Sequence, residues 1–342
     1  MITGHGNDIY HGSRSVVVDF SSNTATSQPH SRLIQQLGKR LHVIANYPEV
    51  NAQSLREKLA VKHELKSNQI LVTNGSTEAF YLIAAAFREK QSLVFIPSFA
   101  EYEDACQMHS HQLAFAPVKQ FTAPFGMKPD VVWLGNPNNP DGTVTTLEAI
   151  EEKLNDYPDT LFVIDEAYGE LCSCFESTVP LLPDYDNLVV IRSMTKLFAV
   201  PGIRLGYLLS SEQQVTRLQK YMQPWSVNAL AIEAGKFIAE HENELSPDIS
   251  ELLWQSRRLQ NELSLLPGLT VTNSNCNYFL AHTEKGTAPK LKEFLLNEYG
   301  FLIRDASNFR GLDEHYFRIA GQSKKKNEEL AEAIKSWIDK KA

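Results

Sequence analysis

The stretch that decides the fold is Ile191–Tyr207, which reads IRSMTKLFAVPGIRLGY. It continues an apolar run and most of its residues are apolar, yet it contains the lysine Lys196 and two arginines. An ammonium group is costly to bury unless a bond or an opposite charge neutralises it. We therefore expect Lys196 to stand at the carboxyl edge of a buried strand, where it lines a crevice and is held by a ligand.

Short apolar runs alternate with amphipathic stretches on both sides of this segment. The runs predict strands at Ile70–Thr73, Leu93–Ile96, Val131–Gly135, Leu161–Asp165, Leu188–Ile191 and Leu205–Leu209. The stretches between them predict helices such as Thr77–Phe87, Tyr102–His109 and Leu147–Asp156. This alternation indicates an α/β domain around a mainly parallel sheet, which collects ligands at the carboxyl ends of its strands.

The rest of the chain predicts a smaller α+β domain. A helix is expected over residues 245–265, and the elements expected after it are strands at Leu269–Thr272, Tyr278–Ala281, Leu302–Arg304 and Phe317–Ala320 and helices at Lys290–Glu298 and Lys324–Lys340. We place the first 44 residues with this part. The expected division is a large domain at 45–242 and a small domain at 1–44 and 243–342.

The composition argues against several classes of protein. The chain of 342 residues carries a net charge of −8, so it lacks the basic surface that nucleic acids attract. The longest apolar run, Ala79–Phe87, is too short to cross a membrane, and the first residues lack the apolar core of a secretory signal. The cysteines Cys106, Cys172, Cys174 and Cys276 have no CxxC spacing. We expect reduced thiols, no metal site and a cytoplasmic location.

Four predicted strands end in polar groups of different chemistry. Ile70–Thr73 leads into a Gly-Ser-Thr helix start that offers N–H groups to an anion, and Val131–Gly135 leads into the turn NPNNPDG. Leu161–Asp165 ends in a carboxylate, which alone could be a helix cap, and Leu188–Ile191 leads to Lys196. Pyridoxal phosphate has an aldehyde, a ring nitrogen, a ring hydroxyl and a phosphate that need these four partners. The strand ends together therefore predict a pyridoxal-phosphate site.

Three motifs carry a resemblance to a known family. They are SMTK with Arg204 eight residues after its lysine, NNPDG at Asn138–Gly142, and DEAY at Asp165–Tyr168. The chain resembles, over essentially its whole length, the fold-type-I pyridoxal-phosphate enzymes of the aspartate-aminotransferase superfamily, in their histidinol-phosphate aminotransferase branch. The resemblance implies a large α/β domain, whose mainly parallel seven-stranded sheet lies between layers of helices, and a smaller α+β domain.

The resemblance also implies the roles of the residues around the cofactor. Lys196 would bond to the cofactor aldehyde, Asp165 would pair with the ring nitrogen, and Tyr168 and Asn139 would hydrogen-bond the ring hydroxyl; Lys196, Asp165 and Tyr168 are the expected catalytic residues. The residues expected at the phosphate are Ser76, Thr77, Ser193, Thr195 and Arg204.

Two aromatic residues match further positions of the family. Phe99 stands where an aromatic side chain stacks on the cofactor ring. Tyr47, in Asn46-Tyr47-Pro48, matches a tyrosine that reaches the cofactor of the neighbouring subunit. That match implies a homodimer with shared active sites.

The expected substrate residues bear on the reaction. Arg318 matches the family's arginine for a substrate anion, and Arg304 matches a second arginine of enzymes whose substrates carry phosphate. Asn23 lies in the family's early asparagine segment, although the usual Asn-Pro-x-Gly after it is replaced by Thr24–Ser27. The segments that resemble the threonine-phosphate decarboxylases of cobalamin synthesis are His5–Tyr10, Pro97–Tyr102, Gln223–Ala231 and Asn308–Asp313.

The expected reaction is the decarboxylation of L-threonine O-3-phosphate to (R)-1-aminopropan-2-yl phosphate and CO₂. His5, Asn23, Arg304 and Arg318 would bind this substrate. The alternative is histidinol-phosphate aminotransferase, which shares nearly all cofactor residues and needs 2-oxoglutarate. A protein that binds the cofactor without catalysis is a third reading, which the complete set of cofactor residues argues against.

Overall fold

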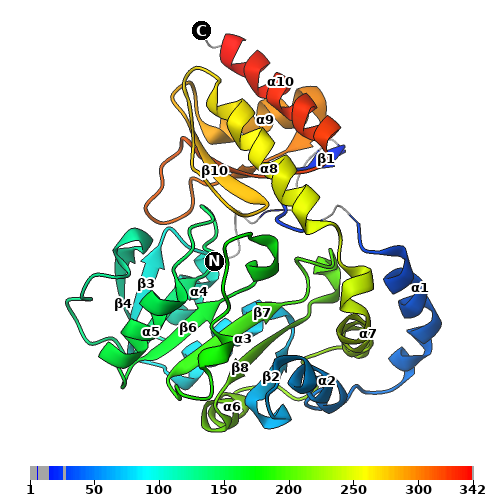
Figure 1. The fold of residues 1–342 in the computed structure, drawn as a ribbon, viewed down its shortest axis with the longest axis vertical. Coiled ribbons are helices and arrows are strands. Elements are labelled where there is room, and N and C mark those ends of the chain that lie inside the picture. The colour runs from blue at the N-terminus through cyan, green and yellow to red at the C-terminus, as the bar shows by residue number, and fades with distance from the viewer. Residues whose placement is uncertain (1–5, 7–14, 26–27, 341–342) are drawn as a thin grey trace.

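The computed structural model describes residues 6, 15–25 and 28–340. Within these residues the strands form a seven-stranded sheet, a four-stranded sheet and a two-stranded pair. Figure 1 shows a larger unit built on the seven-stranded sheet and a smaller unit above it. The predicted α/β class with a mainly parallel seven-stranded sheet is confirmed. None of the helices in the described ranges is long and apolar enough to span a membrane.

The larger sheet has the strand order β2-β8-β7-β6-β5-β3-β4. Its strands are β2 (Ile70–Thr73), β3 (Gln91–Ile96), β4 (Gln112–Pro117), β5 (Val131–Gly135), β6 (Leu161–Asp165), β7 (Leu188–Ser193) and β8 (Gly206–Ser210). Strand β8 is antiparallel to both its neighbours, and all other neighbouring pairs are parallel. The carboxyl ends of β3, β5, β6 and β7 therefore lie along one edge of the sheet.

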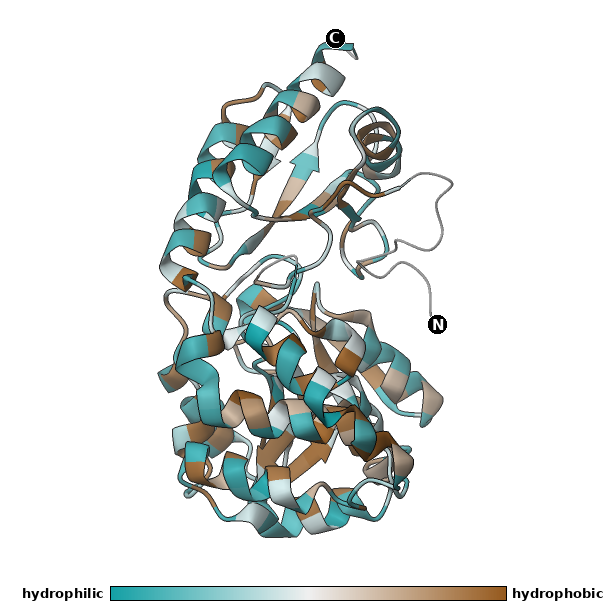
Figure 2. Cartoon of the chain, turned by 90° about the vertical axis from the view of Figure 1, so that its right-hand side faces the viewer, coloured by the Kyte–Doolittle hydropathy of each residue, from teal (hydrophilic) through white to brown (hydrophobic). Residues whose placement is uncertain are grey.

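Apolar side chains cover both faces of this sheet. On β5, Val131 and Trp133 belong to one hydrophobic cluster, and Val132 and Leu134 belong to the other. The covering helices are α2 (Gln53–His63), α3 (Gly75–Ala86), α4 (Ala100–Met108), α5 (Leu147–Asp156), α6 (Glu212–Gln219) and α7 (Ala229–Leu245). Burial on both faces explains why the strands read as unbroken apolar runs, and Figure 2 shows the brown strands enclosed by helices with teal outer faces.

The smaller unit is an antiparallel sheet with helices packed on it. The sheet has the order β12-β13-β10-β9, and the strands are β9 (Leu269–Val271), β10 (Tyr278–Thr283), β12 (Arg304–Asp305) and β13 (Tyr316–Ala320). The helices are α8 (Ile249–Ser264), α9 (Ala288–Tyr299) and α10 (Lys324–Lys340). Phe279, Phe317 and Trp337 lie in its core.

The first described residues belong partly to each unit. Strand β1 (Val18–Asp19) pairs with β11 (Phe301–Leu302) of the smaller unit. Helix α1 (Ser31–Arg40) instead packs on α7, and its Leu33 lies in a core cluster of the larger unit. We therefore propose a domain division before α1, between about residues 25 and 30, in place of one at residue 44.

One predicted element begins later than expected, and one strand was missed. The helix predicted over 245–265 corresponds to α8 but begins later, at Ile249, because Ser246–Asp248 separates α8 from α7, and the Asp248 carboxylate caps α8 by accepting from the Glu251 N–H at 2.9 Å. Strand β4 was not predicted, because an edge strand is only half buried and lacks the continuous apolar signal. The short 3₁₀ helices are η1 (Leu41–Ala45), η2 (Ser67–Gln69), η3 (Val118–Gln120), η4 (Gly169–Leu171), η5 (Val179–Leu181) and η6 (Pro201–Ile203).

Candidate active site

Two adjoining cavities lie where the carboxyl ends of the parallel strands face the smaller unit. The first has a volume of about 340 Å³, and all of its lining residues lie between Ser76 and Arg204. The second has a volume of about 190 Å³ and combines residues of both units. The residues that line both cavities are Phe99, Asn139, Tyr168 and Lys196. A ligand in one cavity therefore lies next to a ligand in the other.

Lys196 stands at the boundary between the cavities. Strand β7 ends at Ser193, and the loop after it carries the half-buried Lys196 into the crevice. Its Nζ lies 5.4 Å from the centre of the Tyr168 ring, and its carbonyl accepts from the Ala25 N–H at 2.9 Å. The lysine side chain can therefore reach a ligand in either cavity.

Asp165 lies at the buried end of the first cavity. Its carboxylate accepts from the Tyr102 hydroxyl at 2.6 Å and from the Ala167 N–H at 3.0 Å. Burial raises the pKa of Asp165 to about 6, while these two donors and Lys196 act in the opposite direction. The two hydrogen-bond donors are neutral, so a cationic ring nitrogen would complete the site around this carboxylate.

An anion cradle occupies the opposite end of the first cavity. Ser76 and Thr77 lie in the first turn of α3, where backbone N–H groups point away from the helix. Gly75 has a φ of +75°, and a Cβ there would collide with the Arg204 guanidinium, so glycine allows the arginine to close over this helix start. Thr195 also lines the cavity, and its Oγ1 lies 2.8 Å from the Oγ of the buried Ser193.

Three residues form the wall shared by the two cavities. The Tyr168 ring packs edge to face on Tyr278, with a distance of 4.9 Å between ring centres. The Phe99 ring packs in the same manner on Tyr102 at 6.0 Å. Asn139 is buried, and its Oδ1 accepts a hydrogen bond from Arg318. A planar ring in the first cavity would therefore meet an aromatic side chain, a phenol and an amide.

The second cavity is lined by two buried arginines. Arg304 and Arg318 lie directly opposite each other on the antiparallel strands β12 and β13, so their side chains share one face of the small sheet. Arg318 donates to Asn139 and to the Ser21 carbonyl, and Arg304 donates to the Asp305 carbonyl and to Asn308 Oδ1 at 2.7 Å.

Asn23 also lines the second cavity with its polar side chain. It is 2% exposed, and neither atom of its amide has a hydrogen-bond partner among the described residues. Leaving a buried amide without a partner is costly. A ligand with a polar or anionic group would satisfy this amide.

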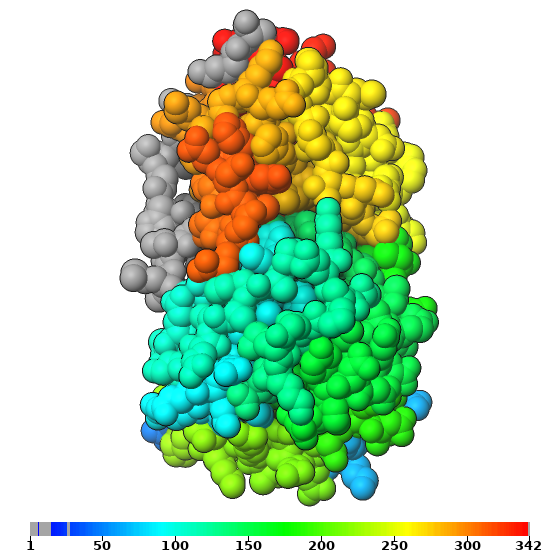
Figure 3. Space-filling model, turned by 90° about the vertical axis from the view of Figure 1, so that its left-hand side faces the viewer, coloured from blue at the N-terminus to red at the C-terminus, as the bar shows by residue number. Residues whose placement is uncertain are grey.

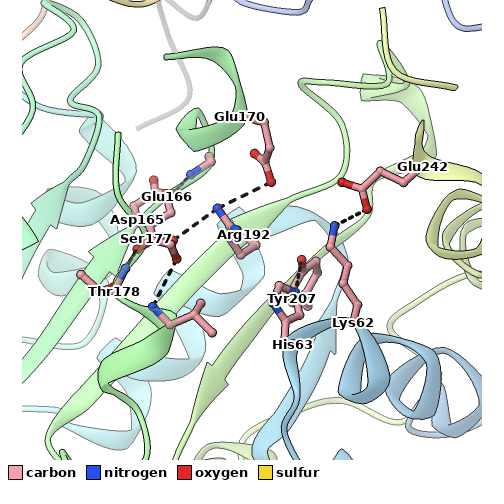
Figure 4. A network of polar contacts seen from close by, with 12 residues as sticks. Lys62, His63, Asp165, Glu166, Glu170, Ser177, Thr178, Arg192, Tyr207 and Glu242 are labelled. Atoms are coloured by element: carbon pink, nitrogen blue, oxygen red, sulfur yellow. Dashed lines mark hydrogen bonds and ion pairs between the residues drawn. The ribbon is translucent and has the colours of Figure 1, made fainter. Parts of the chain in front are cut away.

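A buried ion-pair network braces the strand ends behind the first cavity. Arg192 Nη1 lies 3.3 Å from a Glu166 oxygen and 3.6 Å from a Glu170 oxygen. Figure 4 shows the Arg192 side chain between these two carboxylates. The Glu166 carboxylate also accepts from the Thr178 N–H at 2.6 Å and from the Ser177 hydroxyl at 2.7 Å. Because Glu166 follows Asp165 and Arg192 precedes Ser193, the network fixes the two strand ends that carry site residues.

Tyr47, an expected site residue, does not line these cavities in this chain. Tyr47 is 83% exposed, and its ring lies 5.0 Å from that of Trp225 on the surface. His5 lies outside the described residues. The other expected residues line one of the cavities, except Ser193, which contacts the first through Thr195.

Sequence reasoning missed several residues of the site. Tyr102 is one; the sequence marks it only as the last residue of the segment Pro97–Tyr102, three residues after Phe99, which is one turn of α4. Asn308 and Phe309 are two others, and they belong to the segment after β12 that lines the second cavity. Arg310 in this segment makes a paired contact with Glu103 of α4 at 2.6 and 2.8 Å. Figure 3 shows the orange segment seated on the cyan-green surface of the larger unit.

Comparison with known proteins identifies the family that this fold and site define. Residues 15–334 match the family described as aminotransferase class I and II, and the chain belongs to this family. The cofactor of this family is pyridoxal 5′-phosphate. The groups that line the first cavity fit this molecule: a carboxylate at the buried end, a lysine at the boundary and an anion cradle at the far end. No cluster of three or more metal-ligating side chains occurs in the described part of the chain.

Similar proteins carry two different activities. The solved L-threonine-O-3-phosphate decarboxylase from Porphyromonas gingivalis is 41% identical, with a TM-score of 0.91 over 94% of this chain and 100% of that chain. The threonine-phosphate decarboxylase of Salmonella typhimurium is 30% identical over 94% of this chain and 91% of its own length. Histidinol-phosphate aminotransferase 1 of Carboxydothermus hydrogenoformans is 32% identical over 84% of this chain and 83% of its own length.

Proposed function

We propose that this protein is a pyridoxal-phosphate-dependent decarboxylase that converts L-threonine O-3-phosphate to (R)-1-aminopropan-2-yl phosphate and CO₂. The observation that carries the proposal is the pair of buried, directly opposed arginines beside Lys196. A small substrate with two anionic groups neutralises both guanidinium groups at once. Threonine phosphate, which the similar decarboxylases are named for, is a substrate of this kind.

The positions of the arginines suggest which anion each one takes. Arg318 is bonded to Asn139, which lines both cavities, so it lies next to the cofactor compartment. Arg304 lines only the second cavity and is bonded to Asn308. In threonine phosphate the carboxylate is attached to the reacting carbon and the phosphate is further away. We therefore assign the carboxylate to Arg318 and the phosphate to Arg304 and the Asn23 amide.

Holding the substrate at both ends decides which bond breaks. Bound pyridoxal phosphate supplies a conjugated ring that accepts the electron pair released at the substrate's α-carbon. The negative charge of Asp165 keeps the ring nitrogen protonated and so strengthens that acceptor. The two arginines remove rotation at the α-carbon and so fix which of its bonds stands across the ring plane. We assign the bond to the carboxylate to this position.

Lys196 has two tasks in this proposal. Its Nζ would hold the cofactor through its aldehyde until the substrate amine takes that place, and it would then be positioned to return a proton to the α-carbon. The position of Lys196 at the boundary of the two cavities supports both tasks. Tyr168, whose ring lies 5.4 Å from Nζ, holds the ring hydroxyl together with Asn139.

The test supplies threonine phosphate without any keto acid. A decarboxylase releases CO₂ and forms aminopropanol phosphate over many turnovers, because it needs no amino acceptor. Arg318→Ala should raise KM for threonine phosphate by about 100-fold or more while cofactor affinity changes little. Turnover of histidinol phosphate that depends on 2-oxoglutarate, without CO₂ release from threonine phosphate, would instead identify an aminotransferase.

We also propose that the chain works as a homodimer in which Tyr47 serves the partner's site. Large apolar side chains that are at least 47% exposed stand on either side of Tyr47 in the sequence, at Ile34, Leu41, Ile44 and Val50, and the exposed Trp225 packs against Tyr47. Exposed apolar groups of this density mark association surfaces. The expected result is a dimer in light scattering, with cofactor affinity reduced in Tyr47→Phe. A stable monomer that binds the cofactor with wild-type affinity would contradict the proposal.

A further inference from the structure

Two segments of the different units meet beside the site and bring cysteines together. Ser173 N–H donates to the Asn275 carbonyl at 3.1 Å, and Asn277 N–H donates to the Leu171 carbonyl at 3.1 Å. These two bonds frame Cys172 and Cys276 as a directly opposed antiparallel pair. When two directly opposed residues on antiparallel segments do not hydrogen-bond each other, their Cα atoms are about 4.5 Å apart and their side chains are close. Disulfides span Cα distances from about 4.4 to 6.8 Å.

A third cysteine extends this pair to the surface. Cys174 Sγ lies 3.8 Å from Cys172 Sγ and accepts from the Asn275 amide at 3.2 Å. All three are free thiols, and their exposure decreases from the exposed Cys174 through the half-buried Cys172 to the buried Cys276. The thiols therefore form a continuous path from solvent to the boundary between the units.

The cluster is arranged to make Cys172 reactive. Cys276, which lies directly opposite, is the largest influence that lowers the pKa of Cys172, to about 6, although burial opposes the shift. The thiolate is the form that attacks other sulfur atoms. Cys106 provides the contrast within the same chain, because burial raises the pKa of its thiol to about 12.

We propose that Cys172, Cys174 and Cys276 form a redox-sensitive modification site whose substrates are small-molecule disulfides such as glutathione disulfide. The Cys172 thiolate attacks one sulfur of the small disulfide, the sulfur–sulfur bond breaks, and one thiolate leaves and takes up a proton. Cys276 loses its proton to solvent and attacks the Cys172 sulfur, which displaces the second thiolate. One disulfide between Cys172 and Cys276 forms, and the small disulfide is reduced to two thiols.

The product would tie the substrate side of the site to the cofactor side. Cys172 follows Tyr168 by four residues, and Cys276 precedes Tyr278 by two. The rings of these tyrosines pack on each other, and the Tyr278 hydroxyl donates to the Asn138 carbonyl at 2.9 Å. A disulfide at this point would fasten strand β10, which neighbours the arginine-bearing β13, to the segment after Tyr168.

The test incubates the holoenzyme with glutathione disulfide at neutral pH, followed by alkylation and peptide mapping without reduction. The wild type should lose two thiols, join the Cys172 and Cys276 peptides and retain no glutathione. Cys276→Ser should stop with glutathione bound at Cys172, and Cys106→Ser should behave as the wild type. A link between Cys172 and Cys174, glutathione retained on the wild type, or no loss of thiols would overturn the proposal.

A second measurement needs no variant. The rate at which iodoacetamide alkylates Cys172 is followed against pH in the reduced wild-type holoenzyme. A midpoint below about 7.5 shows the reactive thiolate, whereas a midpoint near the ordinary value of about 8.5 or above would contradict the proposal.

Discussion

The hydrogen bond from Tyr102 to Asp165 gives a prediction that can be worked out from the structure. Both residues are buried, at 3% and 7% exposure, and the oxygens lie 2.6 Å apart. Tyr102→Phe removes the donor and leaves the aromatic packing in place. Losing a hydrogen bond to a charged group costs about 1.5–3 kcal/mol, and losing one to a neutral group costs about 0.5–1.5 kcal/mol. The variant should therefore lose about 1–1.5 kcal/mol more stability when Asp165 is ionised than when it is protonated.

The pH range follows from the pKa of Asp165. Burial raises this pKa from 3.8 to about 6, so the folded apoenzyme binds a proton that the unfolded chain releases. This group therefore lowers the stability of the apoenzyme as pH rises from about 4 to about 6, by about 3 kcal/mol in full. Without the tyrosine donor the pKa rises by about one further unit, so the loss continues to about pH 7.

Urea unfolding of the apoenzyme across this pH range measures the effect. The wild-type and Tyr102→Phe curves should lie closest below about pH 5, and the gap between them should be about 1–1.5 kcal/mol wider above about pH 7. The same substitution in an Asp165→Asn background should show no such pH dependence, since no carboxylate is left to titrate. Curves that stay parallel at all pH values would refute the assigned interaction.

Two further predictions concern the covalent anchor and the buried ion pair. Borohydride reduction of the reconstituted enzyme should leave the cofactor attached to Lys196, and Lys196→Ala should carry none in the mass spectrum; attachment at another lysine would contradict this role. Glu166→Gln should reduce the free energy of unfolding in urea by about 3–5 kcal/mol, because it leaves the Arg192 guanidinium buried beside the half-buried Glu170 alone. A loss below about 1 kcal/mol would mean that water screens this pair.

The sequence predicted the part of the site that depends on strand ends. Asp165, Asn139 and Lys196 each follow an unbroken apolar run, and the carboxyl ends of parallel strands converge at one edge of the sheet. Their proximity therefore follows from the strand pattern alone. The same reasoning predicted strands β2, β5 and β6 with the bounds that the structure has.

Other features depend on tertiary contacts that the pattern of apolar and polar residues does not predict. Tyr102 lies at the start of a helix, where an aromatic residue is typical of a core position, and its bond to Asp165 arises only when α4 packs on the strands β3 and β4. The break between α7 and α8 occurs at Pro247, inside a pattern that continues to look amphipathic. The opposition of Arg304 and Arg318 depends on the register of two short strands, which the segment between them sets.

The positions of the two sets of site residues along the chain have a consequence for how such an enzyme can change during evolution. Every residue that lines the first cavity lies between Ser76 and Arg204, whereas both arginines lie after residue 300. Mutations in the last part of the chain can therefore alter which anions are recognised and leave the cofactor pocket untouched. Relatives of about 30% identity that carry different activities are what such a separation would produce. Exchanging only the segment from β12 to β13 between them is the smallest genetic change expected to move the preference for one substrate toward the other.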